Sequence, residues 1–221
     1  MIRQNDGLRL GAEAFAAAGG NPVVVDAALA AAVAESLVAM VRKGRKGRKG
    51  TLVLPLHYAT VRHHAATGIA AALAVCPEAI RHLHLMLDVH DLPNDVSADA
   101  VATALASIHS WARAVFVRCH RLMPVCRELE ATVGGISIDL AATPERQDTT
   151  LLTEHLSRLR AVAPEGTLCV WNAQRRSDVL AAVQAGCTMV NGPALLTDLL
   201  EPRKATPVPM ESFRRFIPER S

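Results

Sequence analysis

The sequence predicts an α/β fold, a (β/α) barrel of the TIM type that is incomplete or modified. The main observation is that short apolar segments alternate with longer helix-like segments along the 221 residues. Strands that alternate with helices form a parallel sheet covered by helices. None of the predicted strands leads into a glycine-rich phosphate loop, which favours a barrel over a doubly wound dinucleotide-binding sheet. Aromatic residues make up 3% of the chain, so Ala, Leu and Val must form most of the core.

The predicted strands are short and mostly apolar, and each precedes a helix-like segment. They are expected at 52–56, 83–89, 114–118, 135–140, 167–171 and 187–190. A complete barrel has eight strands, so these six predict an incomplete one.

The helix-like segments carry apolar periodicity and, in several cases, a local start or stop signal. Asp26 and Ser97 are candidate N-caps, because short polar side chains accept hydrogen bonds from first-turn amides. Gly186 stands where a helix needs a left-handed residue after its end. Helices are expected at 26–41, 58–75, 98–111, 122–131, 149–162, 177–185 and 195–200.

The barrel domain is expected to span residues 1–202, and the Pro-rich, charged segment 203–221 is expected to be a peripheral tail. The five cysteines are odd in number and include no Cys-x-x-Cys pair, which predicts a reducing, cytoplasmic location. No signal peptide and no membrane span are expected. The most apolar run, 23–41, is interrupted by Asp26 and Glu35.

Basic charge is concentrated in one segment, "RKGRKGRKG" at 42–50, which holds six Lys or Arg residues. Without these six cations the formal net charge of +3 becomes −3. Gly at every third position disfavours a helix, so an exposed, flexible connector is expected. The alternative is a patch for phosphate or anionic lipid. A nucleic-acid-binding domain is not expected, because it would spread its cations over a folded face.

Candidate chemistry is concentrated in "HLHLMLDVHD", residues 82–91. On a strand, the polar residues up to His90 share one face. Asp88, His90 and Asp91 would lie near the carboxyl end of that strand, where barrel proteins bind ligands. They could hold a divalent metal, or they could be part of a polar interior with internal hydrogen bonds. Asn191 is likewise expected where a strand becomes a loop at the barrel mouth.

The order and spacing of several segments resemble the EAL domain, the (β/α) barrel that hydrolyses cyclic di-GMP with two metal ions. The resemblance covers roughly residues 6–202 and begins with "DGLRLGAEAFAAAGG", which is similar to that family's lead-in helices. In chain order, the family motifs V-N-L-S, E-I-T-E, D-D-F-G and K-I-D fall at "TLVLPLHYAT", "LHLMLDVHDL", "ARAVFVRCHR" and "GGISIDLAAT". The segment "TLCVWNAQRRSDVLAAVQAGCTMVNG" is the most similar, to the family's A-E-G-V-E segment, its helix and its Q-G.

The metal-binding positions of the family are mostly replaced. The resemblance places Pro55 at the metal-binding Asn, and Asp88 and Asp91 at the two glutamates of E-I-T-E. Val117 and Arg118 stand at the two metal-binding aspartates. The strand that carries Glu-Ala-Leu is expected to be missing.

The remaining family positions are also changed, with one exception. Asp139 keeps the Asp of K-I-D, while Ser137 replaces its lysine. Trp171 and Gln174 replace the two glutamates of A-E-G-V-E, and Asn191 replaces the glutamine of Q-G.

The resemblance therefore implies a degenerate, non-catalytic module of a bacterial signalling system. It would bind a protein partner or form a homodimer, with cyclic di-GMP as a candidate ligand and no cofactor. The ligand-binding candidates are Asp88, Asp91, Arg118, Asp139, Gln174 and Asn191. Arg118 would repel a divalent ion but could hold a phosphate.

Two alternatives remain open. One is a metal-dependent barrel hydrolase, phosphodiesterase-like, that uses Asp88, His90 and Asp91 with Mg²⁺. The other is a structural interaction domain that binds no small ligand.

Overall fold

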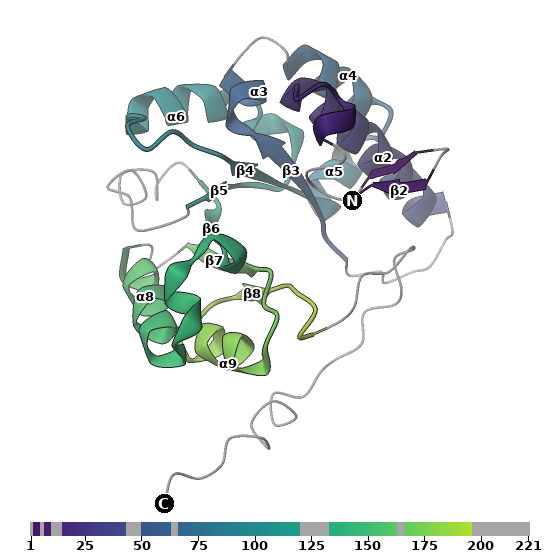
Figure 1. Cartoon of the computed structure of the whole chain (residues 1–221). Helices are drawn as coiled ribbons and strands as arrows, with labels where there is room; N and C mark the ends of the chain where they lie inside the picture. The colour runs from purple at the N-terminus through teal and green to yellow at the C-terminus, as the bar shows by residue number, and fades with distance from the viewer. Residues whose placement is uncertain are drawn as a thin grey trace, which may run out of the picture. The chain divides into compact units, whose positions relative to one another are not determined.

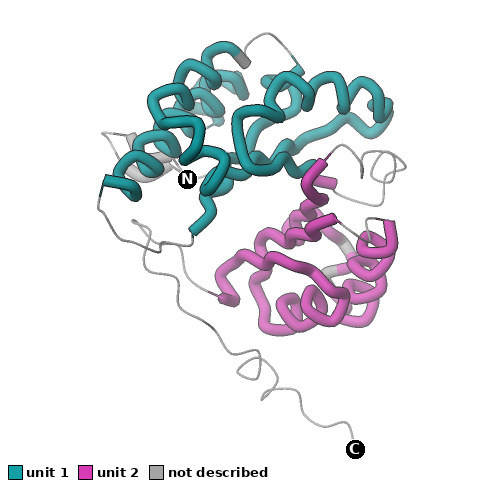
Figure 2. Tube along the Cα trace, turned by 180° about the vertical axis from the view of Figure 1, so that it is seen from behind, with its two compact units in different colours: residues 1–117 teal, residues 118–221 magenta. Residues whose placement is uncertain are grey.

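A computed structural model describes residues 2–4, 7–9, 15–42, 50–62, 66–119, 133–162 and 166–195. The chain forms two compact units, unit 1 (residues 1–117) and unit 2 (residues 118–221), coloured separately in Figure 2. Among the described residues, six parallel strands follow chain order in the sheet, β3-β4-β5-β6-β7-β8. The predicted α/β fold with alternating strands and helices is confirmed.

Unit 1 begins with an antiparallel pair, β1 (Ile2–Gln4) and β2 (Gly7–Arg9), where the resemblance led us to expect lead-in helices. The next elements are α2 (Pro22–Arg42), β3 (Leu52–His57), α3 (Tyr58–Arg62), α4 (Ala66–Ala74), α5 (Glu78–His84), β4 (Leu85–His90), α6 (Ala98–Ala106), the 3₁₀ turn η1 (His109–Trp111) and β5 (Ala114–Arg118). Strand β3 pairs with β4 from Leu52↔Leu85 to His57↔His90. Helices α2, α3 and α5 contact these two strands, and α4 packs against α2 (Figure 1).

The start of α2 corrects one expectation. Asp26 is not the N-cap, because α2 begins at Pro22 and Asn21 Oδ1 accepts the hydrogen bond of the Val23 N–H at 3.0 Å. Asp26 lies one turn inside the helix and is buried, with 3% of its surface exposed. It faces the core with Ala30, Ala34 and Leu37, which have small or branched apolar side chains, as the low aromatic content predicts.

The segment 78–84 corrects a second expectation. It forms helix α5, so His82 and His84 do not belong to the strand with Asp88. Pro77 stands at the N-cap position, and Glu78 in the first turn together with basic residues in the last turn suits the helix dipole. These end signals favour a helix over a strand at a segment whose polar–apolar alternation fits both.

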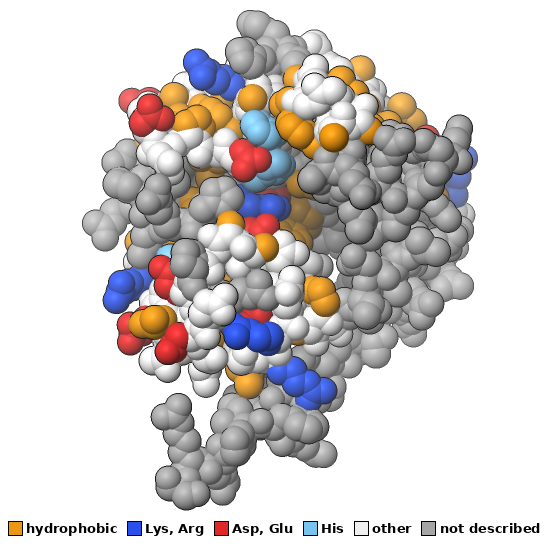
Figure 3. All heavy atoms as spheres, viewed as in Figure 1, with side chains coloured by type: hydrophobic (Ala, Val, Ile, Leu, Met, Phe, Trp, Pro, Cys, Tyr) orange, Lys and Arg blue, Asp and Glu red, His pale blue; other side chains and the backbone are white. Residues whose placement is uncertain are grey.

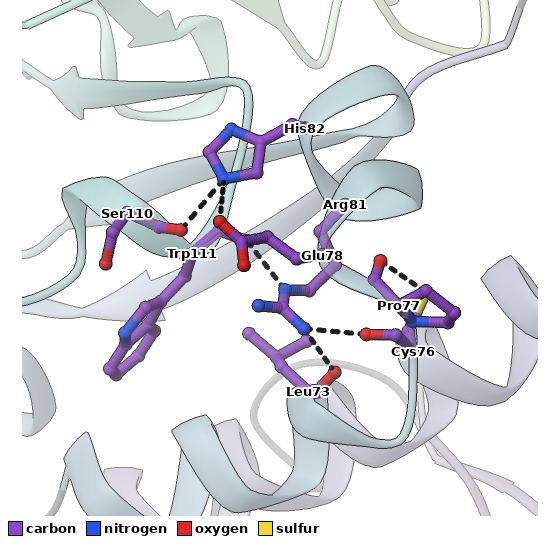
Figure 4. Close-up of polar contacts among 8 residues, drawn as sticks. All are labelled: Leu73, Cys76, Pro77, Glu78, Arg81, His82, Ser110 and Trp111. Carbon is purple, nitrogen blue, oxygen red and sulfur yellow. Dashed lines mark hydrogen bonds and ion pairs between the residues drawn. The ribbon is translucent and has the colours of Figure 1, made fainter.

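Arg81 of α5 anchors this corner of unit 1 (Figure 4). Its Nη1 donates to the carbonyl oxygens of Leu73 and Cys76, at 3.2 and 2.6 Å, and its Nε donates to that of Trp111 at 3.1 Å. The last carbonyl oxygens of a helix lack helical partners. The Arg81 guanidinium donates to such carbonyl oxygens at and just after the end of α4. The contacts are between the side chain and the backbone, which indicates a structural role for Arg81.

Unit 2 contains β6 (Gly135–Asp139), the 3₁₀ turns η2 (Leu140–Ala142) and η3 (Pro144–Gln147), α8 (Thr149–Val162), β7 (Thr167–Trp171), α9 (Arg176–Gln184) and β8 (Met189–Val190). Strand β6 pairs with β7 in parallel from Gly135↔Thr167 to Asp139↔Trp171, and β7 pairs with β8. Helices α8 and α9 pack against each other. The side chains of Leu152, Leu156 and Leu159 on α8 are fully buried.

Several local signals are confirmed. Ser97 accepts a hydrogen bond from the Ala100 N–H as the N-cap of α6, and Gly186 has φ +75° after α9. The helix expected at 58–75 is described as α3 and α4. Some of the expected features lie outside the described residues, in whole or in large part. They are the helices expected at 122–131 and 195–200, residues 43–49 of the basic run and the tail at 203–221.

Among the described helices, α2 is long and apolar enough to cross a membrane by length and composition alone. Core helices of soluble proteins and leader sequences pass the same test, so the expectation of no membrane span stays a prediction.

Candidate ligand-binding site

Polar side chains gather at the carboxyl ends of the strands in each unit. In unit 1 they come from β3 and β4, whose last residues, His57 and His90, pair directly. Asp91 follows immediately and has φ +58°, a conformation that is uncommon for a residue with a side chain. Figure 3 shows histidine and acidic side chains together on one face of the protein.

The hydrogen bonds around His57 define which of its nitrogens carries the proton. The Ala59 N–H donates to His57 Nδ1 at 3.0 Å, so Nδ1 is the acceptor nitrogen of a neutral ring. The other nitrogen, Nε2, then carries the proton and lies 3.5 Å from Asp91 Oδ2. His90 Nδ1 lies 2.8 Å from the same oxygen and donates to it. The two rings meet edge to face with centroids 5.5 Å apart. Asp91 therefore orients two imidazoles.

A buried carboxylate supports this cluster from α2. The His57 backbone N–H donates to Asp26 Oδ2 at 2.9 Å. Burial raises the pKa of Asp26 above the usual 3.8, and the hydrogen bonds and nearby histidines lower it by less.

The structure does not assemble the predicted metal ligands. Asp88 is fully buried within β4, in register with Pro55 and Phe116. His90 and Asp91 bind each other, and His82 and His84 lie on α5. In the part of the chain that is described, no group of three or more His, Cys, Asp or Glu side chains could hold a metal ion.

Unit 2 begins at Arg118, the last residue of β5, and brings this residue together with Asp139 at the end of β6. Arg118 Nη1 lies 3.6 Å from Asp139 Oδ2, and both side chains are less than 20% exposed. The Arg118 guanidinium also lies over the Trp171 ring, with Cζ 5.6 Å from the ring centroid. Asp139 Oδ1 accepts hydrogen bonds from the Ala141 N–H at 2.9 Å and from Asn172 Nδ2 at 2.7 Å.

The loops after β7 and β8 are joined by their backbones at this end of unit 2. The Ala173 N–H donates to the Asn191 carbonyl at 3.0 Å, and the Ala194 N–H donates to the Ala173 carbonyl. Gly192 permits this close approach, because a Cβ there would lie 2.3 Å from the Ala173 backbone. Gln174 and Asn191, which follow β7 and β8, are exposed at the surface.

Three residues of these clusters were not predicted: His57, Trp171 and Asn172. The signal that could have found them is the register of parallel strands, because each stands at or just after the last residue of a predicted strand. Asn172 has φ +60°, a conformation that Asn tolerates better than most residues.

Comparisons with known proteins identify the fold. No family profile and no curated protein matches the sequence. The solved EAL domain of Xanthomonas citri FimX, in complex with c-diGMP, is 15% identical with a TM-score of 0.63, covering 87% of this chain and 77% of that one. The PaMucR phosphodiesterase in its c-di-GMP complex is 14% identical with a TM-score of 0.63, and the match covers 83% of this chain and 74% of that one. Klebsiella pneumoniae BlrP1, in a manganese and cy-diGMP complex, is 13% identical with a TM-score of 0.59, covering 86% and 48%.

Proposed function

We propose that this chain, which has the fold of solved EAL domains, is a non-catalytic signalling module that binds cyclic di-GMP and a protein partner. The observation that supports this most directly is the Arg118–Asp139 pair in unit 2. A guanidinium stands where the family resemblance places a metal-binding aspartate, so a fixed organic cation takes the place of a metal ion.

The absence of turnover is proposed from the chemistry of the same positions. Two-metal hydrolysis needs carboxylates that hold both ions and orient the attacking water. Val117 is apolar and buried, and Arg118 carries a permanent positive charge. A divalent ion beside that guanidinium would be repelled at short range.

Cyclic di-GMP is proposed as the ligand from the fold and from Arg118. The FimX, PaMucR and BlrP1 structures hold that dinucleotide. A guanidinium donates in-plane hydrogen bonds to a phosphodiester in a geometry that a carboxylate site without metal cannot provide. Binding should therefore be independent of Mg²⁺.

Calorimetric titration with cyclic di-GMP, with and without Mg²⁺, tests this proposal. We expect the same affinity in both, and a loss of at least about tenfold in Arg118→Ala, the size of one charge-assisted hydrogen bond. Arg113→Ala is the matched control, because Arg113 is exposed and precedes β5, at the strand end opposite to Arg118. Binding that requires Mg²⁺, or that survives Arg118→Ala unchanged, would contradict the proposal.

A turnover assay separates this proposal from the metal-dependent hydrolase. We expect no linear dinucleotide from cyclic di-GMP with Mg²⁺ or Mn²⁺. Linear product that scales with protein and disappears in Asp88→Ala would establish the hydrolase instead.

For the protein partner, we propose a second copy of the chain that covers strand β3. In the described residues β3 pairs with β4 alone, and it is the first strand in the sheet order. Unpaired strand edges are usually covered, and Pro55 lacks the N–H of one edge position. A two-fold dimer covers such an edge with one self-complementary surface. Light scattering combined with amide exchange at 51–56 tests this: we expect a dimer with slow exchange, and a monomer would contradict it.

A further inference from the structure

Three helices of unit 1 end at or next to a large apolar side chain that is exposed. Val41 lies in the last turn of α2 and is 45% exposed, Val75 follows α4 and is 70% exposed, and Leu83 lies in the last turn of α5 and is 60% exposed. Single exposed apolar residues are ordinary, whereas a group of them marks a surface that contacts another apolar body.

The three helix ends lie at the amino-terminal end of strands β3 and β4. Asp26, in the second turn of α2, accepts a hydrogen bond from His57 at the carboxyl end of β3, so the last turn of α2 lies toward the other end of that strand. Helix α5 leads directly into β4, and His84 Nδ1 donates to the carbonyl oxygen of Gly50, just before β3, at 2.8 Å. The Arg81 guanidinium joins the end of α4 to α5 (Figure 4), and α2 contacts both helices. This surface, the amino-end face, consists of Val41, Arg42, Val75 and Leu83.

Positive charge adjoins the amino-end face through the basic run. Arg42 is the last residue of α2 and is exposed, and five more Lys or Arg residues follow in the sequence before Gly50. The acidic residue of α5, Glu78, is paired with His82 at 3.6 Å. The rest of the chain is mildly acidic, so this concentration of cations does not follow from a generally basic composition.

Aliphatic side chains beside a dense group of cations suit the surface of an anionic membrane. The aliphatic groups enter the boundary between headgroups and acyl chains, and Lys and Arg are attracted to the lipid charge. A nucleic acid would also attract the cations, but it stacks on aromatic rings, and the amino-end face has none. The face lies at the strand end opposite to His57 and His90, so it does not overlap the polar cluster of unit 1.

We propose that unit 1 binds peripherally to anionic lipid bilayers through the amino-end face. Val41, Val75 and Leu83 contact the headgroup boundary, and the charge of the basic run selects anionic lipid. One weak signal gives only marginal, reversible attachment, whereas an apolar contact and a polybasic segment together hold a protein on a membrane. The cytoplasmic leaflet is the anionic one, which agrees with the cytoplasmic location that the sequence predicts.

Vesicle flotation with the full chain tests this proposal. The vesicles consist of phosphatidylcholine alone, or of phosphatidylcholine with about one lipid in three replaced by phosphatidylglycerol. We expect binding to the anionic vesicles only. Binding should fall at least about tenfold when NaCl is raised from about 0.1 M to about 0.5 M, because salt screens the attraction. The assay contains no cyclic di-GMP, so its result is independent of the proposed dinucleotide binding.

Substitutions of the apolar residues test the face separately from the charge. The double variant Val75→Ser, Leu83→Ser should lower the partition coefficient at least about tenfold, because two aliphatic contacts with the lipid are lost. The matched control is Val24→Ser, Leu151→Ser. These side chains are 52% and 51% exposed, and they lie in the first turn of α2 and on α8. The control should bind within about twofold of wild type.

Substitutions of the cations test the choice of lipid. Replacing the six cations of 42–50 with Ser should weaken binding to the anionic vesicles at least about a hundredfold. Replacing the five Lys or Arg residues of the tail at 203–221 is the control, and it should have a much smaller effect. Thermal unfolding of each variant confirms that it is folded.

Absence of binding to the anionic vesicles, or equal losses in the apolar variant and its control, would overturn the proposal. Flotation that survives Val75→Ser, Leu83→Ser but disappears with the basic run would show attraction by charge alone and would overturn it as well. Binding to duplex DNA in place of vesicles, unchanged by the apolar variant, would assign the basic run to a nucleic acid.

Discussion

The backbone N–H of His57 donates a hydrogen bond to Asp26 Oδ2 at 2.9 Å, which joins the carboxyl end of β3 to the second turn of helix α2. Asp26 is 3% exposed, and burial raises its pKa above 3.8. This hydrogen bond connects α2 and β3, which the basic run separates in sequence. It requires the Asp26 carboxylate to be buried.

Asp26→Asn should increase stability at neutral pH. The folded state holds this proton more tightly than the unfolded chain, so Asp26 lowers the stability progressively as pH rises above about 3.8. Asn keeps an oxygen for the His57 N–H and has no charge to desolvate. Urea unfolding at pH 4 and pH 7 should show a stability gain for the variant that is larger at pH 7. Asp95→Asn, at an exposed position, serves as the control. A loss of stability of Asp26→Asn relative to wild type from pH 4 to pH 7 would show that the ionised Asp26 carboxylate is favourable.

Gly192→Ala should disrupt the loop after β8. Its φ is +152°, and a Cβ would lie 2.3 Å from both the N and the O of Ala173, which are backbone atoms that cannot move aside cheaply. We expect a loss of roughly 2–4 kcal/mol in the free energy of unfolding.

Gly68→Ala is the matched control for that substitution. Gly68 lies in helix α4 with open space around its Cβ position, so alanine should stabilise the protein by about 1 kcal/mol. If Gly192→Ala lowers the stability and Gly68→Ala raises it, the effect at Gly192 comes from its local geometry and not from the removal of a glycine in general. Equal effects at both sites would contradict the close approach at Gly192.

Ser97→Ala should weaken the start of α6. Ser97 Oγ accepts the Ala100 N–H at 3.3 Å, and loss of an N-cap typically costs about 1 kcal/mol. Ser97→Asp keeps an acceptor at the same position and should retain most of the stability. Chemical denaturation of both variants checks this, and an alanine variant as stable as wild type would mean that the cap contributes little.

Cys187 should resist alkylation in the folded protein. Burial raises the pKa of its thiol to about 12, so at pH 8 about one thiol in ten thousand is the reactive thiolate. Iodoacetamide labelling followed by peptide mass spectrometry should show slow modification of Cys187 in buffer and fast modification in denaturant. Rapid labelling without denaturant would indicate that α9 and β8 open readily around this residue.

The sequence by itself determined the features that depend on neighbours along the chain. The strands at 114–118 and 167–171 and the helix at 149–162 were predicted with the bounds that the structure has. Apolar periodicity and helix-end residues act over a few positions, which is why Ser97 could be recognised as a cap and Gly186 as a helix stop.

Tertiary structure decided the features that depend on contacts between distant segments. Asp26 has a side chain typical of an N-cap, but it lies in the core, where it accepts a hydrogen bond from the His57 N–H at the end of β3. The helix begins one turn earlier, and Asn21 accepts the hydrogen bond of a first-turn amide. The polar–apolar alternation of residues 82–91 fits a strand. Residues 82–84 nevertheless belong to helix α5, in which the Arg81 side chain donates hydrogen bonds to the backbone carbonyls of Leu73 and Cys76. Arg118 meets Asp139 and Trp171 through parallel pairing, whose register arises when the strands pack and not from any local pattern.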